Sequence, residues 1–284
     1  MGIVLGGGVR SPIGEGMCGL VGAAVCRGGD VCLTDAEVSR MRDALAHRGP
    51  DGAGLWRGEQ VVLGHRRLAV IDPGAGAQPM VSADGRFVLA YNGELYNDAE
   101  VRAELAAGGA TFETSCDTET VLQAIGTWWR GAMGRLRGMY AFACYDKQRR
   151  MLLLGRDPLG IKPLFTWKGV RGSAEELVFA SELPGVLAHP RVPRIPNLVA
   201  ISGYMTTIRT TLGALTLYDG VLALRPGEWV EIDLSGEEMG FESFDWWAEH
   251  GPVRWAGGDP TERVREAVRD SVVLNAAGAL VAHA

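Results

Sequence analysis

The first apolar segment of the chain is Met17-Cys18-Gly19-Leu20-Val21-Gly22-Ala23-Ala24-Val25. Its length and its glycine and valine content predict a buried β-strand, with a cysteine where the strand begins. A capping box follows at Thr34-Asp35-Ala36-Glu37, and Val38, Met41 and Leu45 then repeat at helical spacing. The chain is therefore predicted to pass from this strand into a helix.

Later segments repeat both kinds of pattern. Short apolar runs separated by turn residues predict a β-meander between Val61 and Tyr91. Two helices are expected next, one around Val101 and one starting near Asp117, and strand patterns return between Met139 and Ala180. This order of strands, helices and strands favours an α+β layer structure over alternating βαβ units.

The composition excludes several classes of function. Apolar residues make up 47% of the 284 residues and charged residues 22%, which is far from the composition of a disordered chain. The apolar runs are strand-length, so no membrane role is expected, and a net charge of -6 gives no basic footprint for nucleic acid. The five cysteines form no C-x-x-C pair, so we expect no disulfide framework, no metal site and a reducing cytoplasm.

Cys18 becomes a candidate nucleophile through the motifs that accompany it. A cysteine that attacks an amide needs a base, a site for the developing oxyanion and groups that hold the substrate. Taken alone, a cysteine favours a structural role, because it behaves as a small apolar residue when buried. Seven motifs occur here in order: Met17-Cys18-Gly19-Leu20-Val21-Gly22, His47-Arg48-Gly49-Pro50-Asp51-Gly52, Gly64-His65-Arg66-Arg67-Leu68-Ala69-Val70-Ile71-Asp72, Gly76-Ala77-Gln78-Pro79, Tyr91-Asn92-Gly93-Glu94-Leu95-Tyr96-Asn97, Ser115-Cys116-Asp117-Thr118-Glu119 and Gly155-Arg156-Asp157-Pro158-Leu159-Gly160-Ile161-Lys162-Pro163-Leu164.

Together these motifs closely resemble the glutaminase domain of glutamine-hydrolysing asparagine synthetases, which are class II glutamine amidotransferases. The resemblance runs from Met17 to about Pro190 and continues more thinly to the end of the chain. It implies the N-terminal nucleophile hydrolase fold, a four-layer αββα sandwich of two antiparallel sheets between helices. It also implies that the α-amino group of the nucleophile is the base. An α-amine has a pKa of about 8, so much of it is neutral at physiological pH and can accept a proton.

The resemblance also implies a role for individual residues. Cys18 corresponds to the nucleophile, and Asn92 and Gly93 correspond to the oxyanion hole, where glycine lets the backbone approach closely. Arg67 corresponds to the residue whose planar guanidinium binds the α-carboxylate of glutamine. The implied glutamine-binding set is Arg67, Leu68, Val70, Asn92, Gly93, Glu94 and Asp117, and the two acidic residues would hold the α-ammonium group.

Several of these segments also have simpler interpretations. Asn92-Gly93 after a strand is the strongest short-range signal for a hairpin turn, and Asp117 is typical of a helix N-cap. A histidine such as His47 near a cysteine suggests a thiol-protease dyad, although we favour a positioning loop for this motif. The segments Gly160-Ile161-Lys162-Pro163 and Ser181-Glu182-Leu183 are interpreted as scaffold.

Two features depart from the family. The nucleophile is residue 18, whereas the mechanism requires it to be the first residue, so residues 1–17 are interpreted as an extension absent from the active form. No Ser-Gly-Gly-x-Asp-Ser loop for ATP occurs, so ATP and Mg²⁺ are expected only with a missing synthetase domain, and no cofactor with the glutaminase part. Residues 18–200 are predicted to form the glutaminase domain, and residues 201–284 to complete it and begin the linker.

The predicted function is hydrolysis of glutamine to glutamate and ammonia, as the glutaminase half of an ATP-dependent asparagine synthetase that amidates aspartate. Two alternatives stay open: an amidotransferase of a related synthetase with another acceptor, and a non-catalytic remnant that binds glutamine. The expected partners are glutamine, a separate synthetase subunit and a second copy of the chain in a homodimer. Neither nucleic acid nor a membrane is expected.

Overall fold

The computed structural model describes residues 17–26, 31–68, 76–208, 212–251, 257 and 259–281. Its strands form two six-stranded antiparallel sheets. Sheet A consists, in spatial order, of β10 (Val221–Ala223), β8 (Phe165–Arg171), β9 (Ala174–Ala180), β1 (Gly19–Val25), β3 (Val61–Arg67) and β2 (Gly52–Arg57). Sheet B consists of β12 (Gly240–Asp245), β11 (Glu228–Asp233), β7 (Met151–Arg156), β6 (Gly138–Asp146), β5 (Phe87–Leu95) and β4 (Met80–Val81).

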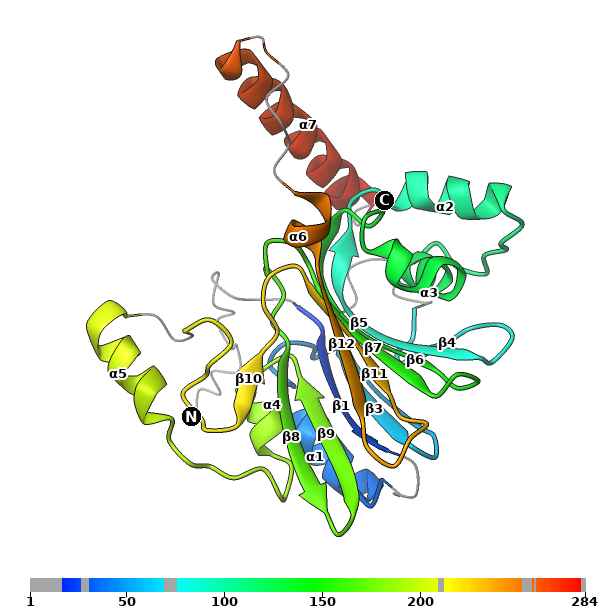
Figure 1. Ribbon diagram of the computed structural model, residues 1–284. Helices are drawn as coiled ribbons and strands as arrows, with labels where there is room; N and C mark the ends of the chain where they lie inside the picture. The colour runs from blue at the N-terminus through cyan, green and yellow to red at the C-terminus, as the bar shows by residue number, and fades with distance from the viewer. Residues whose placement is uncertain are drawn as a thin grey trace, which may run out of the picture.

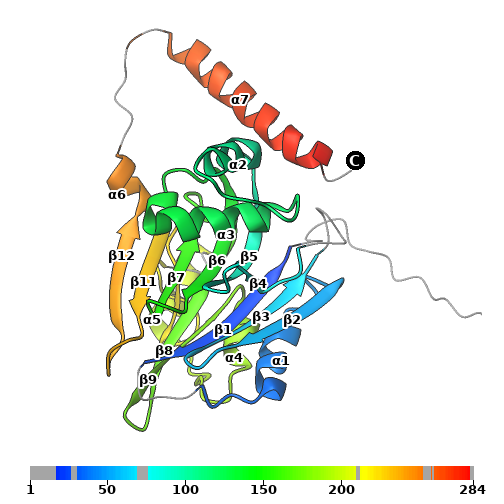
Figure 2. The ribbon, with the colours of Figure 1, turned by 90° about the vertical axis from the view of Figure 1, so that its right-hand side faces the viewer.

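Helices cover the outer face of each sheet, so the predicted αββα sandwich is confirmed (Figures 1 and 2). The described helices are α1 (Asp35–Asp43), α2 (Asp98–Ala107), α3 (Asp117–Trp128), the 3₁₀-helix η1 (Trp129–Ala132), α4 (Leu183–Leu187), α5 (Leu198–Thr207), α6 (Trp246–His250) and α7 (Pro260–Val281). Helices α1 and α4 lie against sheet A, and α3 lies against sheet B. The described part of the chain contains no helix long and apolar enough to cross a membrane.

Strand β1 lies in the interior of the sandwich because its side chains are apolar on both faces. Leu20 and Ala24 pack between the two sheets, whereas Val21 and Ala23 pack towards Met41 on α1. Successive side chains of a strand point to opposite faces, so a strand buried on both sides needs a continuous apolar run. The run after Cys18 meets this requirement and places Cys18 immediately before the first residue of β1.

Strand β5 extends through the Asn92-Gly93 dipeptide, so the hairpin-turn interpretation of these two residues is wrong. Asn92 pairs with Ala141 of β6 and Gly93 pairs with Tyr140 in an uninterrupted antiparallel register. A Cβ atom at position 93 would lie 2.5 Å from the Met139 carbonyl oxygen. The glycine is therefore required by close packing of two strands rather than by a turn.

Asp117 is the first residue of α3 and not its N-cap, which is Cys116. The N-cap interpretation of Asp117 is therefore wrong, and its carboxylate is used elsewhere. Asp117 Oδ2 accepts a hydrogen bond from the Leu95 N–H at 3.0 Å, which ties the start of α3 to the end of β5. This contact turns the carboxylate towards the sheet, where the candidate site lies.

Candidate active site

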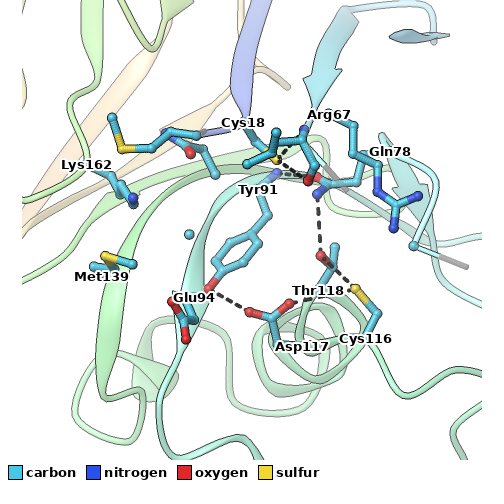
Figure 3. A pocket seen from close by; sticks show the side chains of 15 residues that line it. Cys18, Arg67, Gln78, Tyr91, Glu94, Cys116, Asp117, Thr118, Met139 and Lys162 are labelled. Carbon is cyan, nitrogen blue, oxygen red and sulfur yellow. Dashed lines mark hydrogen bonds between the residues drawn. The ribbon is translucent and has the colours of Figure 1, made fainter. Parts of the chain in front are cut away.

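A cavity of about 100 Å³ opens beside the start of β1 and is bounded by β3, β5 and the start of α3 (Figure 3). Its lining includes six of the seven glutamine-binding residues expected from the sequence, together with the expected nucleophile. These residues are Cys18, Arg67, Leu68, Asn92, Gly93, Glu94 and Asp117. The remaining predicted residue, Val70, lies outside the described residues.

The thiol of Cys18 faces the backbone of Leu68. The Leu68 N–H donates to Cys18 Sγ at 3.4 Å, and Sγ lies 3.7 Å from the Leu68 carbonyl oxygen. Burial raises the pKa of the Cys18 thiol, and the negative charge of Asp117 adds to this effect. The thiol therefore needs a base and nearby positive charge before it can act as a thiolate.

The loop after α1 contacts the backbone of Cys18. Arg48 Nε donates to the Cys18 carbonyl oxygen at 3.0 Å, and the same guanidinium forms an ion pair with Glu182. Gly49 lies so close to β3 that a Cβ atom there would be 2.4 Å from the Arg66 carbonyl carbon. The loop and the segment around Glu182 thus position Cys18, as expected for scaffold.

Neither His47 nor His65 lines the cavity. The His47 side chain is 60% exposed, and its Nε2 lies 2.9 Å from Glu182 Oε2. His65 is buried in β3, its Nε2 donates to the Tyr91 carbonyl oxygen at 2.9 Å, and burial lowers its pKa to about 4. The described lining therefore offers no imidazole as a base for the thiol.

Asn92 and Gly93, the residues expected to form an oxyanion hole, both line the cavity. Asn92 is 1% exposed, lines the cavity, and its amide Nδ2 has no hydrogen-bond partner among the described residues. A buried donor without a partner destabilises the fold unless a ligand accepts its hydrogen bond. The amide is therefore available for an oxygen atom that enters the cavity beside Cys18.

Asp117 is the most deeply buried acid of the cavity. Its carboxylate accepts hydrogen bonds from the Leu95 N–H and, at 3.4 Å, from the hydroxyl of Tyr91. Burial raises the pKa of Asp117 to about 6, and the neighbouring charges of Asp98 and Glu94 act in the same direction. Burial also raises the pKa of Glu94. A cation that enters beside these two acids would favour their ionised forms, and each carboxylate would then attract it.

The structure adds residues to which the sequence assigned no role in the site. Gln78 accepts a hydrogen bond from the Tyr91 N–H at 2.6 Å through Oε1 and donates to Thr118 Oγ1 at 3.4 Å. Met17, Cys116 and Lys162 also line the cavity. The scaffold interpretation of the segment that contains Lys162 is thus incomplete, because its side chain reaches the candidate active site. Only spatial proximity to Cys18 identifies these residues.

The described residues contain no group of three or more His, Cys, Asp or Glu side chains that could hold a metal ion. The side chains that line the cavity include two thiols, two amides, two acids and two cations. Such a set can bind a zwitterion and attack a carbonyl group beside it.

Comparisons with solved structures agree with the fold. The glutamine phosphoribosylpyrophosphate amidotransferase of Bacillus subtilis superposes with a TM-score of 0.53 at 22% identity, over 81% of this chain and 49% of that chain. A structure of the allosteric regulatory enzyme of purine biosynthesis gives a TM-score of 0.57 at 21% identity, with the same coverage of 81% and 49%. Both share the arrangement of sheets and helices described above.

Comparisons with known sequences identify the family. The glutamine-hydrolysing asparagine synthetase 3 of Bacillus subtilis is 35% identical over 201 residues, which are 70% of this chain and 32% of that protein. Asparagine synthetase 1 of the same organism is 34% identical over 235 residues, or 83% of this chain and 36% of that protein. The chain thus spans about a third of the length of these relatives. Residues 17–247 match the family model of the glutamine amidotransferase domain, and the chain therefore belongs to that family.

Proposed function

We propose that this chain hydrolyses the side-chain amide of glutamine to glutamate and ammonia, with Cys18 as the nucleophile. The observation that carries this proposal is the unpartnered Nδ2 of Asn92, a residue that lines the same cavity as Cys18. A donor held in place beside a nucleophile is what acyl transfer needs, because the negative charge on oxygen develops only during the attack.

The reaction follows from these positions in a chain that begins at Cys18. The α-amine of Cys18 accepts the thiol proton, and the thiolate forms a bond to the amide carbon of glutamine. The electron pair of the carbonyl bond moves to the oxygen, which accepts hydrogen bonds from Asn92 Nδ2 and the Gly93 N–H. The oxyanion then collapses, the carbon–nitrogen bond breaks, and the α-ammonium group returns its proton to the departing nitrogen. Water hydrolyses the thioester to glutamate and restores the thiol.

Charge complementarity supports glutamine as the substrate. Arg67 and Asp117 line the same small cavity. Arg67 supplies a positive charge and Asp117 a negative charge. A free amino acid presents one carboxylate and one ammonium group, which these side chains complement. Glu94 provides a second acid for the ammonium end, and the Leu68 backbone forms the wall beside the thiol.

The larger activity is a proposal that rests on the longer relatives. We propose that the ammonia serves an ATP-dependent synthetase that makes asparagine from aspartate, and that ATP and Mg²⁺ bind only to that synthetase. The glutaminase part, residues 18–200 completed by residues 201–284, needs no cofactor for the steps above. A separate synthetase subunit, a second copy of this chain and a cytoplasmic location belong to the same proposal.

Covalent trapping tests the nucleophile. A glutamine analogue that carries an electrophile in place of the amide is expected to label Cys18 alone, because this thiol is the proposed nucleophile. Peptide mapping by mass spectrometry locates the adduct, and Cys18→Ala is the control that should stay unlabelled. An adduct on Cys116, the other thiol of the cavity, with Cys18 unmodified would overturn the assignment. Reversible glutamine binding without labelling would favour the non-catalytic alternative.

Glutamine binding is expected to weaken as the pH falls through the pKa of Asp117, which is about 6. Below this pH the carboxyl group is protonated and no longer attracts the α-ammonium group, so affinity should fall about tenfold between pH 7 and pH 5. Calorimetry with the Cys18→Ala variant measures binding without turnover. Glu94 is proposed to contact the same ammonium group. The fall in affinity that remains in the Glu94→Gln variant therefore measures the contribution of Asp117.

The matched control is Asp117→Asn, which should bind glutamine weakly and with little pH dependence between pH 5 and pH 7. The same raised pKa means that the native state holds this proton more tightly than the unfolded chain. Its stabilising effect is complete below about pH 4 and is lost as the pH rises through about 6. Unchanged affinity of the wild-type site across this range would show that Asp117 does not contact the substrate.

A further inference from the structure

The loop between β7 and β8 holds Lys162 by both of its backbone groups. The Lys162 N–H donates to Asp157 Oδ2 at 2.9 Å, and the Lys162 carbonyl oxygen accepts a hydrogen bond from Arg156 Nε at 2.9 Å. Asp157 is fully buried, and its other oxygen accepts from the Ile161 N–H at 2.9 Å. Two buried or partly buried charges thus fix the backbone of one lysine, which limits where its side chain can point.

The Lys162 side chain points into the cavity that contains Cys18 and approaches it from the side opposite Arg67 (Figure 3). Lys162 is only 5% exposed. Within the described part of the chain, its ammonium group donates no hydrogen bond and forms no ion pair, and its contacts there are purely electrostatic. A charge held in a mostly buried position at a cavity, without an ion pair, is typical of a functional site.

Charged side chains line the cavity from four parts of the fold: Arg67 at the end of β3, Glu94 in β5, Asp117 at the start of α3 and Lys162 after β7. A fifth charged group, Arg48, lies outside the lining and donates to the Cys18 carbonyl oxygen. Arg48 is already paired with Glu182, and Arg67 is the candidate partner of the substrate carboxylate. Lys162 is therefore the cation of the described cavity that forms no ion pair with a protein carboxylate and has no proposed contact with the substrate, although the charges of Glu94 and Asp157 act on it from a distance.

The electrostatic influence of Lys162 on the thiol has a definite sign. Burial is the largest influence on the pKa of Cys18 and raises it, and Asp117 adds to this effect. The Leu68 N–H and the positive charges of Arg67 and Lys162 lower the same pKa. Once Arg67 pairs with a carboxylate, its charge is largely neutralised, and Lys162 remains to offset the cost of a buried thiolate.

We propose that Lys162 supplies the positive charge that stabilises the Cys18 thiolate before it attacks the substrate. The thiol proton goes to the α-amine of Cys18 in the reaction described above, the electron pair stays on sulfur, and Lys162 keeps its own proton throughout. The role depends on the proposed function only for the identity of the substrate, because a thiolate can be observed without glutamine.

Alkylation by iodoacetamide as a function of pH tests this role. The reagent reacts with the thiolate, and mass spectrometry of the Cys18 peptide separates this thiol from the four other cysteines. The chain that retains residues 1–17 is suitable, because it has no α-amine at Cys18 to complicate the profile. Lys162→Met should move the midpoint of alkylation upward by about one pH unit. Lys162→Arg should restore it, because the charge returns on a side chain of similar length.

Two further variants show whether a shift of the midpoint arises from the lost charge or from a disturbed fold. Lys168→Met removes a lysine of β8 that pairs with Glu175 of β9, outside the cavity, and should leave the midpoint unchanged. Asp117→Asn removes a charge that opposes the thiolate and should move the midpoint downward, opposite to Lys162→Met. An unchanged midpoint in a folded Lys162→Met variant would overturn the proposal. A shifted midpoint, together with no glutamine hydrolysis by a chain that begins at Cys18, would instead refute the proposed function and leave the role of Lys162 intact.

Discussion

A chain that begins at Cys18 should hydrolyse glutamine at least about a hundredfold faster than the chain that keeps residues 1–17. In the longer chain the nitrogen of Cys18 belongs to a peptide bond, which is not basic and cannot accept the thiol proton. No histidine lines the described cavity and could replace it. Met17 itself forms part of the lining, so a preceding residue also occupies space beside the thiol.

Three preparations separate the loss of the α-amine base from the steric effect of a residue before Cys18. The first begins at Cys18, the second keeps residues 1–17, and the third carries a single glycine before Cys18. The glycine adds almost no bulk, yet it moves the free amine one residue away from the thiol. If the base is decisive, the second and third chains should be equally slow in glutaminase rate at equal concentration. Comparable rates from all three would exclude the α-amine as the base, and His47 would be the first side chain to test.

The parts of the fold that were predictable are those in which local and distant interactions agree. The capping box of α1 is confirmed: the Thr34 N–H donates to Glu37 Oε2 at 2.8 Å, and the Glu37 N–H donates to Thr34 Oγ1 at 3.3 Å. Both partners lie within one turn of the chain, so the sequence alone contains the whole interaction. The apolar run of β1 was recognisable for a similar reason, because burial on both faces leaves a continuous pattern.

Strand β2 shows what the sequence could not reveal. Its residues 52–57 include two glycines and alternate weakly, so the strand pattern is poor. The strand forms because it pairs along its whole length with β3. Gly54 is needed there because a Cβ atom would lie 1.8 Å from the Gln78 carbonyl oxygen, a contact with a distant segment. Helix α5 was missed as well, because the segment after Pro190 has few regular apolar positions.

The candidate site was predictable where the family motif names a residue, and not where only packing decides. Glu182 and Lys162 both lie in segments interpreted as scaffold. The structure places Glu182 behind the nucleophile, paired with Arg48, and places Lys162 in the cavity. The position of Lys162 depends on how the loop between β7 and β8 folds around Asp157. The order of residues in the sequence does not reveal this fold.

Asn92→Ala should lower glutaminase turnover by about a hundredfold or more, or roughly 3 kcal/mol of transition-state stabilisation. Asn92 Nδ2 is buried and without a partner in the described structure, so we expect its hydrogen bond to form with the oxyanion. An interaction present only in the transition state affects kcat and kcat/KM equally and leaves KM nearly unchanged. The loss should therefore appear in kcat, measured with a chain that begins at Cys18.

Matched variants decide whether the missing donor causes this loss. Asn197→Ala removes a side chain of the same size from the N-cap of α5, outside the cavity, and should leave kcat unchanged. Asn92→Asp keeps the shape of the side chain but replaces the donor with an acceptor, so it should be at least as slow as Asn92→Ala. Since an amide without a partner contributes little to the free protein, thermal unfolding should distinguish catalytic loss from unfolding. A folded Asn92→Ala chain with wild-type turnover would show that other donors bind the oxyanion and that Asn92 has only a structural role in β5.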